Sequence, residues 1–378
     1  MPDNIIAMLQ IDRIMNFKEE KTFIAEEREN YGQQFTRRSF LKVGGILSAG
    51  LLLNPLTKAV SKSPSVREYD ITTNGITLHV TELGEGPAVL FCHGFPDTSY
   101  TWRKQMQAVA TAGYRAIAPD MRGYGRSSAP ADAALYTPFY TAGDLVGLLD
   151  SINIATAVLV GHDWGAAHAW NAAMMRPDRF TAIFCISVPY FPRGEVSAFE
   201  KMRIAGHQND FYMFEQMKPE SDQVWANAAV MIPGVLYWAS GSAPASTRWN
   251  PFDPMRSLHR AAPGPLPSWA EPDYVANNIR EFKRTGFHGG LNYYRSAEPY
   301  FFQSAVFKGA KINQPCFYIT GKSDGLGIIY LPVEKMHAGL PNLAGTLEID
   351  NVGHWVQHEA SAQVSEQLVK FLGVVKPS

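Results

Sequence analysis

The segment AVLVGHDWGAAHAW, residues 157–170, decides the fold class. Four apolar residues predict a buried strand, and an alanine-rich stretch from 166 to 175 predicts a helix. Gly161 and Gly165 mark a tight turn between the two elements. Such a strand–turn–helix unit holds its central residue, here Asp163, on a sharp bend above the sheet. The alternative is an aspartate that does no more than cap the helix.

The residue type at the centre of this turn indicates the chemistry. A serine in this place attacks acyl carbons, whereas a carboxylate is already ionised at neutral pH and displaces leaving groups at sp³ carbon. The N-terminus of the following helix supplies a positive potential that favours the charged form of Asp163. We therefore predict that Asp163 is a carboxylate nucleophile.

Strands alternate with helices on both sides of this unit. The alternation predicts an α/β fold with a mostly parallel central sheet flanked by helices. An Asn74-Gly75 turn between two alternating runs predicts a β-hairpin ahead of it. The further strands that we expect cover residues 88–92, 114–119, 157–160, 180–188, 315–320 and 346–349. The expected helices run near 102–109, 141–152 and 166–175, and through 364–371 at the end of the chain.

The alternation stops between residues 189 and 305, in a stretch rich in Met, Trp, Tyr, Phe and Pro. We predict that 190–305 forms a mostly helical cap, inserted after the sixth strand. The core of the fold is then made of two parts, residues 65–189 and 306–378.

The acid and the base are expected after the nucleophile along the chain, in that order. Asp324 follows the 315–320 strand and is the candidate acid, and His354 follows the last strand and is the candidate base. His354 would activate water, while Asp324 fixes its tautomer. A plain turn would also explain Asp324, and His358 suggests a two-histidine metal pair. No third ligand or HExxH motif accompanies the histidines, so we expect no metal.

The loop His93-Gly94-Phe95-Pro96 follows the 88–92 strand. In sites of this kind, this loop and the residue after the nucleophile each supply a backbone N–H to an oxyanion hole. We assign these donors to Phe95 and Trp164. We also expect His93 and Trp164 to bind substrate, although support of the loop is the plainer interpretation of His93.

Composition excludes several classes of protein. The chain has 378 residues, of which 46% are apolar and 18% charged, with a net charge of −1, so a large core is expected. The chain lacks the excess of basic residues that nucleic-acid-binding proteins usually carry. After residue 60 it also lacks the basic amphipathic face expected of a protein that binds a membrane surface. The sequence contains neither a phosphate-binding loop nor a dinucleotide-binding fingerprint, so we expect no cofactor. Cys92, Cys185 and Cys316 lie in apolar runs and are expected in the core, not in disulfides or a metal site.

The first 60 residues have the anatomy of a signal peptide and leader. Arg37-Arg38 is followed by Phe40-Leu41-Lys42, an apolar run over 43–53 and a stretch of small residues near Ala59. This pattern resembles the twin-arginine (Tat) export signal of bacteria. The resemblance implies recognition by the Tat translocation machinery and a periplasmic or secreted protein. The apolar run is too short for a comfortable membrane anchor, and a basic patch before a buried helix is the alternative.

Five motifs together resemble the soluble epoxide hydrolases of the α/β-hydrolase superfamily. They are HGFPDTSYTWR (93–103), DMRGYGRSSAP (120–130), GHDWGAAHAW (161–170), TGKSDG (320–325) and GHWVQHE (353–359). The resemblance covers the chain from about residue 65 to its end, within the branch that uses a carboxylate nucleophile. It implies hydrolysis of a small apolar epoxide to a vicinal diol by water, through an ester on Asp163, without a cofactor.

The same resemblance implies two cap tyrosines that bind the substrate and protonate the ring oxygen. Tyr294, in GLNYYR (290–295), matches the second tyrosine motif of the family. Tyr212 is the candidate for the first, although Gln216 stands one residue earlier than the family pattern has it. Buried core aromatics are the alternative for both.

Three other functions remain open from the sequence. A haloalkane dehalogenase shares the nucleophile, acid and base, and binds halide through ring N–H groups. The tryptophans available for that role are Trp164, Trp225, Trp238, Trp249 and Trp269. A non-catalytic binding protein on this fold is less favoured because all three catalytic positions are filled. An ester hydrolase is disfavoured by the aspartate in place of serine.

Overall fold

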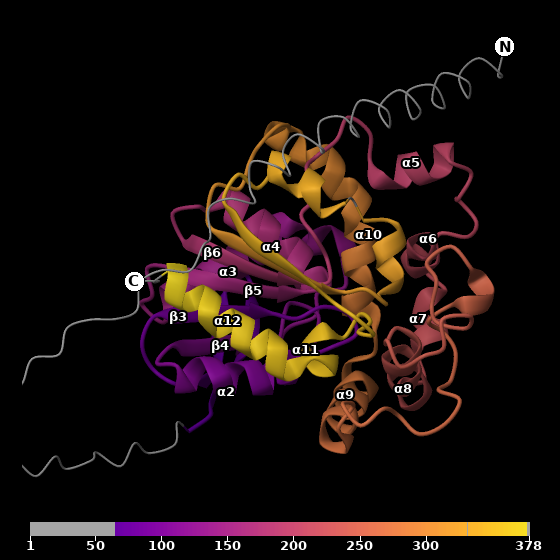
Figure 1. Ribbon diagram of the computed structural model, residues 1–378, viewed down its shortest axis with the longest axis horizontal. Coiled ribbons are helices and arrows are strands. Elements are labelled where there is room, and N and C mark those ends of the chain that lie inside the picture. The colour runs from indigo at the N-terminus through magenta and orange to yellow at the C-terminus, as the bar shows by residue number, and fades with distance from the viewer. Residues whose placement is uncertain (1–64, 331, 376–378) are drawn as a thin grey trace, which may run out of the picture. The chain divides into compact units, whose positions relative to one another are not determined.

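A computed structural model describes residues 65–330 and 332–375 (Figure 1). The predicted export signal, with Arg37 and Arg38, lies outside the described residues. Within the described residues, no helix has the length and apolar character that a membrane crossing requires.

Eight strands form one sheet, and six of them pair in parallel with a neighbouring strand. They are β1 (Arg67–Thr73), β2 (Ile76–Leu83), β3 (Ala88–Cys92), β4 (Arg115–Pro119), β5 (Ala157–His162), β6 (Phe180–Ile186), β7 (Cys316–Gly321) and β8 (Leu343–Ile349). Their order across the sheet is β1-β2-β4-β3-β5-β6-β7-β8. Strand β2 runs antiparallel to both of its neighbours, β1 and β4, and the rest pair in parallel. The predicted fold class is confirmed.

The α-helices follow the strands and also fill the insertion. They are α2 (Arg103–Thr111), α3 (Pro138–Ser151), α4 (Trp164–Met175), α5 (Ala198–Ile204), α6 (Tyr212–Met217), α7 (Ser221–Trp225), α8 (Ala228–Trp238), α9 (Pro272–Thr285), α10 (His288–Gln303), α11 (Val356–Glu359) and α12 (Ser361–Val375). Short 3-10 helices are η1 (Ser99–Trp102), η2 (Ala133–Tyr136), η3 (Pro254–Arg256), η4 (Ser304–Phe307), η5 (Gly325–Ile328) and η6 (Val333–Ala338).

Two apolar layers cover the two faces of the sheet because side chains alternate along each strand. On β3, Leu90 packs into one cluster while Val89 and Phe91 pack into the other. Leu145 of α3 and residues of α4 and the cap join the first cluster. Met106 of α2 and residues of α12 join the second. Both faces of the central strands are therefore dry, which explains their continuous apolar sequences.

The carboxyl ends of β3, β5, β6, β7 and β8 all reach the same edge of the sheet, because these strands are parallel. Ligand sites of open α/β sheets lie at this edge. The segment 190–305 follows β6 and contains α5 to α10 without a strand among its residues. In Figure 1, α5 to α9 lie together at the right of the sheet.

The strand and helix boundaries differ from expectation by a few residues. Strand β8 begins at Leu343, three residues before the expected start, because its alternating exposed and half-buried residues give an edge strand a weak apolar signal. Helix α3 begins at Pro138, which fits the first turn of a helix because it has no N–H to leave unpaired. The boundaries of the predicted cap stay a prediction.

Candidate active site

Asp163 lies on the turn between β5 and α4. Its backbone φ is 54°, a value that residues other than glycine rarely adopt. The turn needs small neighbours, since a Cβ at Gly165 would overlap the backbone carbonyl of Cys92. One carboxylate oxygen of Asp163 accepts the backbone N–H of Phe95 at 2.8 Å. A Cβ on Gly94 would collide with the Asp163 carboxylate, so only glycine allows this approach. The predicted turn geometry therefore presents an almost fully buried carboxylate.

His354 lies between two carboxylates. Its Nε2 is 3.4 Å from Oδ2 of Asp163, and its Nδ1 is 3.0 Å from Oδ2 of Asp324. The other oxygen of Asp324 accepts the backbone N–H of Leu326 at 3.0 Å, which fixes the carboxylate. All three residues are buried, with exposed fractions of 7% for Asp163 and 5% for Asp324 and His354. The structure thus brings the predicted nucleophile, acid and base together.

These contacts set the charge state of the resting site. Burial alone would lower the pKa of His354, but the charges of Asp324 and Asp163 raise it to about 10. Burial also opposes ionisation of Asp163, yet the hydrogen bond and charge of His354 and the N–H of Phe95 lower the pKa of Asp163. Near neutral pH the site is therefore an imidazolium held between two carboxylates.

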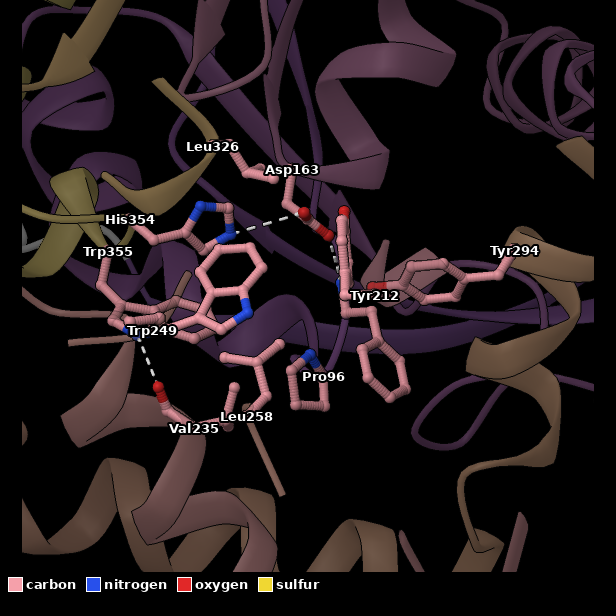
Figure 2. Close-up of a pocket in the computed structure, with 12 residues that line it drawn as sticks. Pro96, Asp163, Tyr212, Val235, Trp249, Leu258, Tyr294, Leu326, His354 and Trp355 are labelled. Carbon is pink, nitrogen blue, oxygen red and sulfur yellow. Dashed lines mark hydrogen bonds and ion pairs between the residues drawn. The ribbon is translucent and has the colours of Figure 1, made fainter. Parts of the chain in front are cut away.

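A small cavity opens onto the Asp163 carboxylate (Figure 2). About 20 Å³ of it can hold the centre of a water molecule, so the cavity has room for at least one water. Its lining is mostly apolar and consists of Phe95, Pro96, Asp163, Tyr212, Val235, Ala239, Trp249, Leu258, Tyr294, Leu326, His354 and Trp355. In the view of Figure 2, His354 and the two tyrosines lie on opposite sides of Asp163.

The two predicted tyrosines meet in this cavity from different cap helices. Tyr212 begins α6 and Tyr294 lies in α10, and their rings are edge to face with centroids 6.2 Å apart. Burial, followed by the nearby charge of Asp163, raises the pKa of Tyr212 well above its usual value. Burial and the neighbouring Tyr212 and Asp163 do the same for Tyr294. Both hydroxyls therefore keep their protons and can act as hydrogen-bond donors across the neutral range.

The two predicted oxyanion donors differ in what the structure shows. The N–H of Phe95 already points at Asp163. Trp164 is the first residue of α4, so its N–H has no partner within the helix. The Trp164 ring is not part of the cavity lining but packs edge-on against Tyr294 at 4.9 Å. Its expected contact with substrate stays a prediction.

The expectation that His93 binds substrate is corrected by the structure. The ring lies outside the cavity lining and is 1% exposed. Its Nε2 accepts the backbone N–H of Met121 at 2.9 Å, which leaves the proton on Nδ1 to face the carbonyl of Gly94 at 3.0 Å. Both ring nitrogens are thus occupied by backbone groups, and His93 supports the loop that carries Phe95.

Two residues near His354 were missed by sequence reasoning although they lie in recognised motifs. His162 donates from Nε2 to the backbone carbonyl of His354 at 2.8 Å, and burial lowers its pKa to about 3, so it stays neutral. Glu359 is buried and accepts the backbone N–H groups of Gly241, Gly353 and Trp355. It thereby ties the loop of His354 to the segment after α8. The available signals were the position of His162 next to the nucleophile and the position of Glu359 in the motif GHWVQHE.

A third missed residue, Ser187, had no sequence signal at all. It directly follows β6, and its hydroxyl lies between Asp324 and His354. A serine after a strand is too common to stand out in a sequence.

The histidines of the possible metal pair are occupied by other partners. Nε2 of His358 lies 2.7 Å from the hydroxyl of Thr101, and His354 faces its two carboxylates. Across residues 65–330 and 332–375, no group of three or more His, Cys, Asp or Glu side chains could hold a metal ion. Within the same residues the three cysteines are buried and unpaired.

Comparisons with known proteins agree on one family. The family described as "alpha/beta hydrolase fold" matches residues 87–361. A protein of Caballeronia sordidicola named "Epoxide hydrolase" is 73% identical over 311 residues, which cover 82% of this chain and 94% of that protein. "Epoxide hydrolase A" of Mycobacterium tuberculosis is 34% identical, with 82% of this chain and 98% of that protein covered.

Solved structures give the same result. An epoxide hydrolase from an endophytic Streptomyces has a TM-score of 0.78 at 34% identity, covering 84% of this chain and 98% of its own. An epoxide hydrolase of Vigna radiata has a TM-score of 0.73 at 33% identity, covering 82% and 98%.

The ion pair leads to a prediction about the charge of His354. Replacing Asp163 by Asn removes one of the two anions that hold the proton, so the pKa of His354 should fall. NMR titration of the imidazole should show a wild-type pKa near 10 and a lower value in Asp163→Asn. Asp150→Asn, on an exposed carboxylate, is the control and should leave the pKa unchanged. A wild-type pKa of about 6.5, the ordinary value, would contradict the ion pair.

Proposed function

The chain belongs to the epoxide hydrolase family of the α/β-hydrolase superfamily, and on that premise we propose that it converts epoxides to vicinal diols through a covalent ester on Asp163. The observation that carries the proposal is the shared cavity of an ionised Asp163, His354 at 3.4 Å and two protonated tyrosines. This set supplies a nucleophile, a base and two acids.

In the first half of the reaction the epoxide ring opens. The hydroxyls of Tyr212 and Tyr294 hold the ring oxygen, and one of them gives up its proton as the carbon–oxygen bond breaks. Asp163 attacks the ring carbon from the opposite side and forms a hydroxyalkyl ester. This step uses the carboxylate that the resting ion pair keeps ionised, and it needs no base.

In the second half water hydrolyses the ester. The ester is neutral, so His354 loses one of its two anionic partners and its proton becomes easier to remove. The neutral imidazole then takes a proton from water, and hydroxide attacks the carboxyl carbon of Asp163. The oxyanion forms beside the N–H of Phe95, with the N–H of Trp164 as the second donor. Collapse releases the diol, whose second hydroxyl takes one proton of the water. The other water proton stays on His354 and restores the imidazolium, while the proton that His354 gave up earlier restores the tyrosine.

The cavity indicates the substrate class. Side chains such as Val235, Leu258, Leu326 and Trp249 give it an apolar wall, which suits a small apolar epoxide. The same apolar side chains set which epoxides the cavity accepts. The dehalogenase alternative is not favoured, because the cavity offers two tyrosine hydroxyls and the relatives are named epoxide hydrolases.

The ester predicts different fates for two variants. His354→Gln should form the ester and fail to hydrolyse it, so its intact mass should rise by one molecule of styrene oxide, used as the probe epoxide. Asp163→Asn should gain no mass and lose nearly all turnover, because the amide is a poor nucleophile. Asp150→Asn is the matched control and should turn over like the wild type. Full turnover by His354→Gln would remove that residue from the mechanism.

The tyrosines should act on ring opening alone. Tyr212→Phe and Tyr294→Phe should each slow ester formation by roughly 100-fold, the lower range for loss of a general acid. Tyr293→Phe is the control, since the Tyr293 hydroxyl donates to the carbonyl of Arg122 at 3.0 Å, outside the cavity lining. Rapid quenching with mass spectrometry measures the rate. Wild-type rates in both cap variants would show that the ring oxygen is protonated by another group.

We also propose export by the Tat pathway to the periplasm or the medium, supported by the sequence of residues 36–59. Replacing both Arg37 and Arg38 by Lys should keep the protein in the cytoplasm of a bacterial host, as immunoblots of cell fractions would show. Arg28→Lys, upstream of the motif, is the control and should be exported normally. Equal export of the double variant would contradict the proposal.

A further inference from the structure

Ser187 lies where the acid and the base of the site meet. Its hydroxyl oxygen is 2.6 Å from Oδ2 of Asp324 and 2.9 Å from Nδ1 of His354. Nδ1 of His354 is itself 3.0 Å from the same Asp324 oxygen. The three atoms therefore form a tight triangle, and Ser187 has no exposed surface.

Proton counting assigns a direction to each contact of the triangle. The Asp324 carboxylate has no proton to give, so the Ser187 hydroxyl donates to it. A hydroxyl has one proton and two lone pairs, and its remaining lone pairs can accept a hydrogen bond from Nδ1–H of His354. Ser187 thus holds both members of the pair at once and keeps the proton of His354 on Nδ1. Nε2 is then left free for the water that attacks the ester.

The backbone at Ser187 is held in a conformation that costs free energy. Its φ is 67°, and the N–H of Val188 donates to the carbonyl of Ile186 at 2.8 Å, so the three residues form a γ-turn with positive φ at its centre. This form of the γ-turn is rare and strained. Two hydrogen bonds hold it in place, from the hydroxyl of Tyr318 to the Ser187 carbonyl at 2.6 Å and from the Ser187 N–H to Ile319 at 2.9 Å.

Glycine would adopt this backbone conformation without strain, but it has no hydroxyl. Strained residues of this kind gather at functional sites, where the surrounding structure holds them. The turn brings the hydroxyl to the sheet edge that also carries Asp163 and Asp324, one strand from each. The strain is therefore tied to the position of a polar group at the site.

We infer that Ser187 is a positioning residue for the Asp324–His354 pair and that it serves the hydrolysis of the ester, not its formation. The inference rests on the proposed function, in which only the second half-reaction uses His354 as a base. Ring opening depends on Asp163 and the two tyrosines, whereas the Ser187 hydroxyl hydrogen-bonds to Asp324 and His354. Loss of that hydroxyl should therefore separate the two half-reactions.

The test compares the two rates in the full chain with styrene oxide as the probe, by rapid quenching and intact-mass analysis. Ser187→Ala keeps the Cβ and removes the hydroxyl. It should form the ester within about 2-fold of the wild-type rate and hydrolyse it at least about 10-fold more slowly, as expected for loss of a hydrogen bond to a charged group. The ester should then accumulate during turnover.

Ser187→Gly removes the hydroxyl and also the strain, so it remains available if the alanine variant does not fold. It should hydrolyse the ester as slowly as Ser187→Ala while unfolding at a higher temperature than that variant. Ser296→Ala is the matched control, because this buried hydroxyl donates to a carbonyl of its own helix, that of Tyr293. Both of its half-reactions should run at wild-type rates.

Wild-type hydrolysis in both Ser187 variants would overturn the inference. Equal slowing of ester formation and hydrolysis would also overturn it, since that result indicates a general loss of structure. Absence of any ester in His354→Gln would instead contradict the proposed function, and the role of Ser187 with it.

Discussion

One buried carboxylate must stay ionised, and the rest of the site follows from that requirement. An isolated carboxylate in an apolar cavity would take up a proton, because burial penalises the charged form. Two groups prevent this at Asp163: the imidazolium of His354 and the backbone N–H of Phe95. The sheet supplies both, since parallel strands end at one edge and Gly94 lets the Phe95 loop come close to the carboxylate.

In the proposed mechanism, the same ion pair orders the two halves of the reaction. While Asp163 is charged, it holds a proton on His354 and prevents that residue from acting as a base. Formation of a neutral ester removes the charge, so the base becomes available only when there is an ester to hydrolyse. The ring of His354 meanwhile keeps its contacts with Asp324 and Ser187 through Nδ1. Timing is thus a consequence of charge, and no movement of the backbone is required for it.

Sequence reasoning reached the residues whose type and place in a motif carry the chemistry. Asp163 followed from the turn between a strand and a helix, and Asp324 and His354 followed from the order of acid and base along the chain. The sheet was predicted because its central strands are apolar on both faces. Strand β8 was only half found, because an edge strand alternates with polar residues and carries less signal.

The remaining residues depend on contacts between distant segments. Ser187 and His354 are 167 residues apart, and nothing about a serine after a strand announces a partner so far along the chain. His93 was misassigned because its motif marks the loop, whereas its role follows from the Met121 N–H that occupies Nε2. Glu359 lay in a quoted motif, but its three backbone partners come from two segments that only the fold brings together.

The central claim is that Asp163 itself takes the oxygen of water during each cycle. A single turnover in heavy-oxygen water, with enzyme in excess over styrene oxide, tests it most directly. Peptide mass analysis should find the heavy oxygen in the carboxylate of Asp163, while the diol released in that turnover carries none. Heavy oxygen in the first diol, with an unlabelled Asp163, would show that water attacks the epoxide directly and would contradict the account.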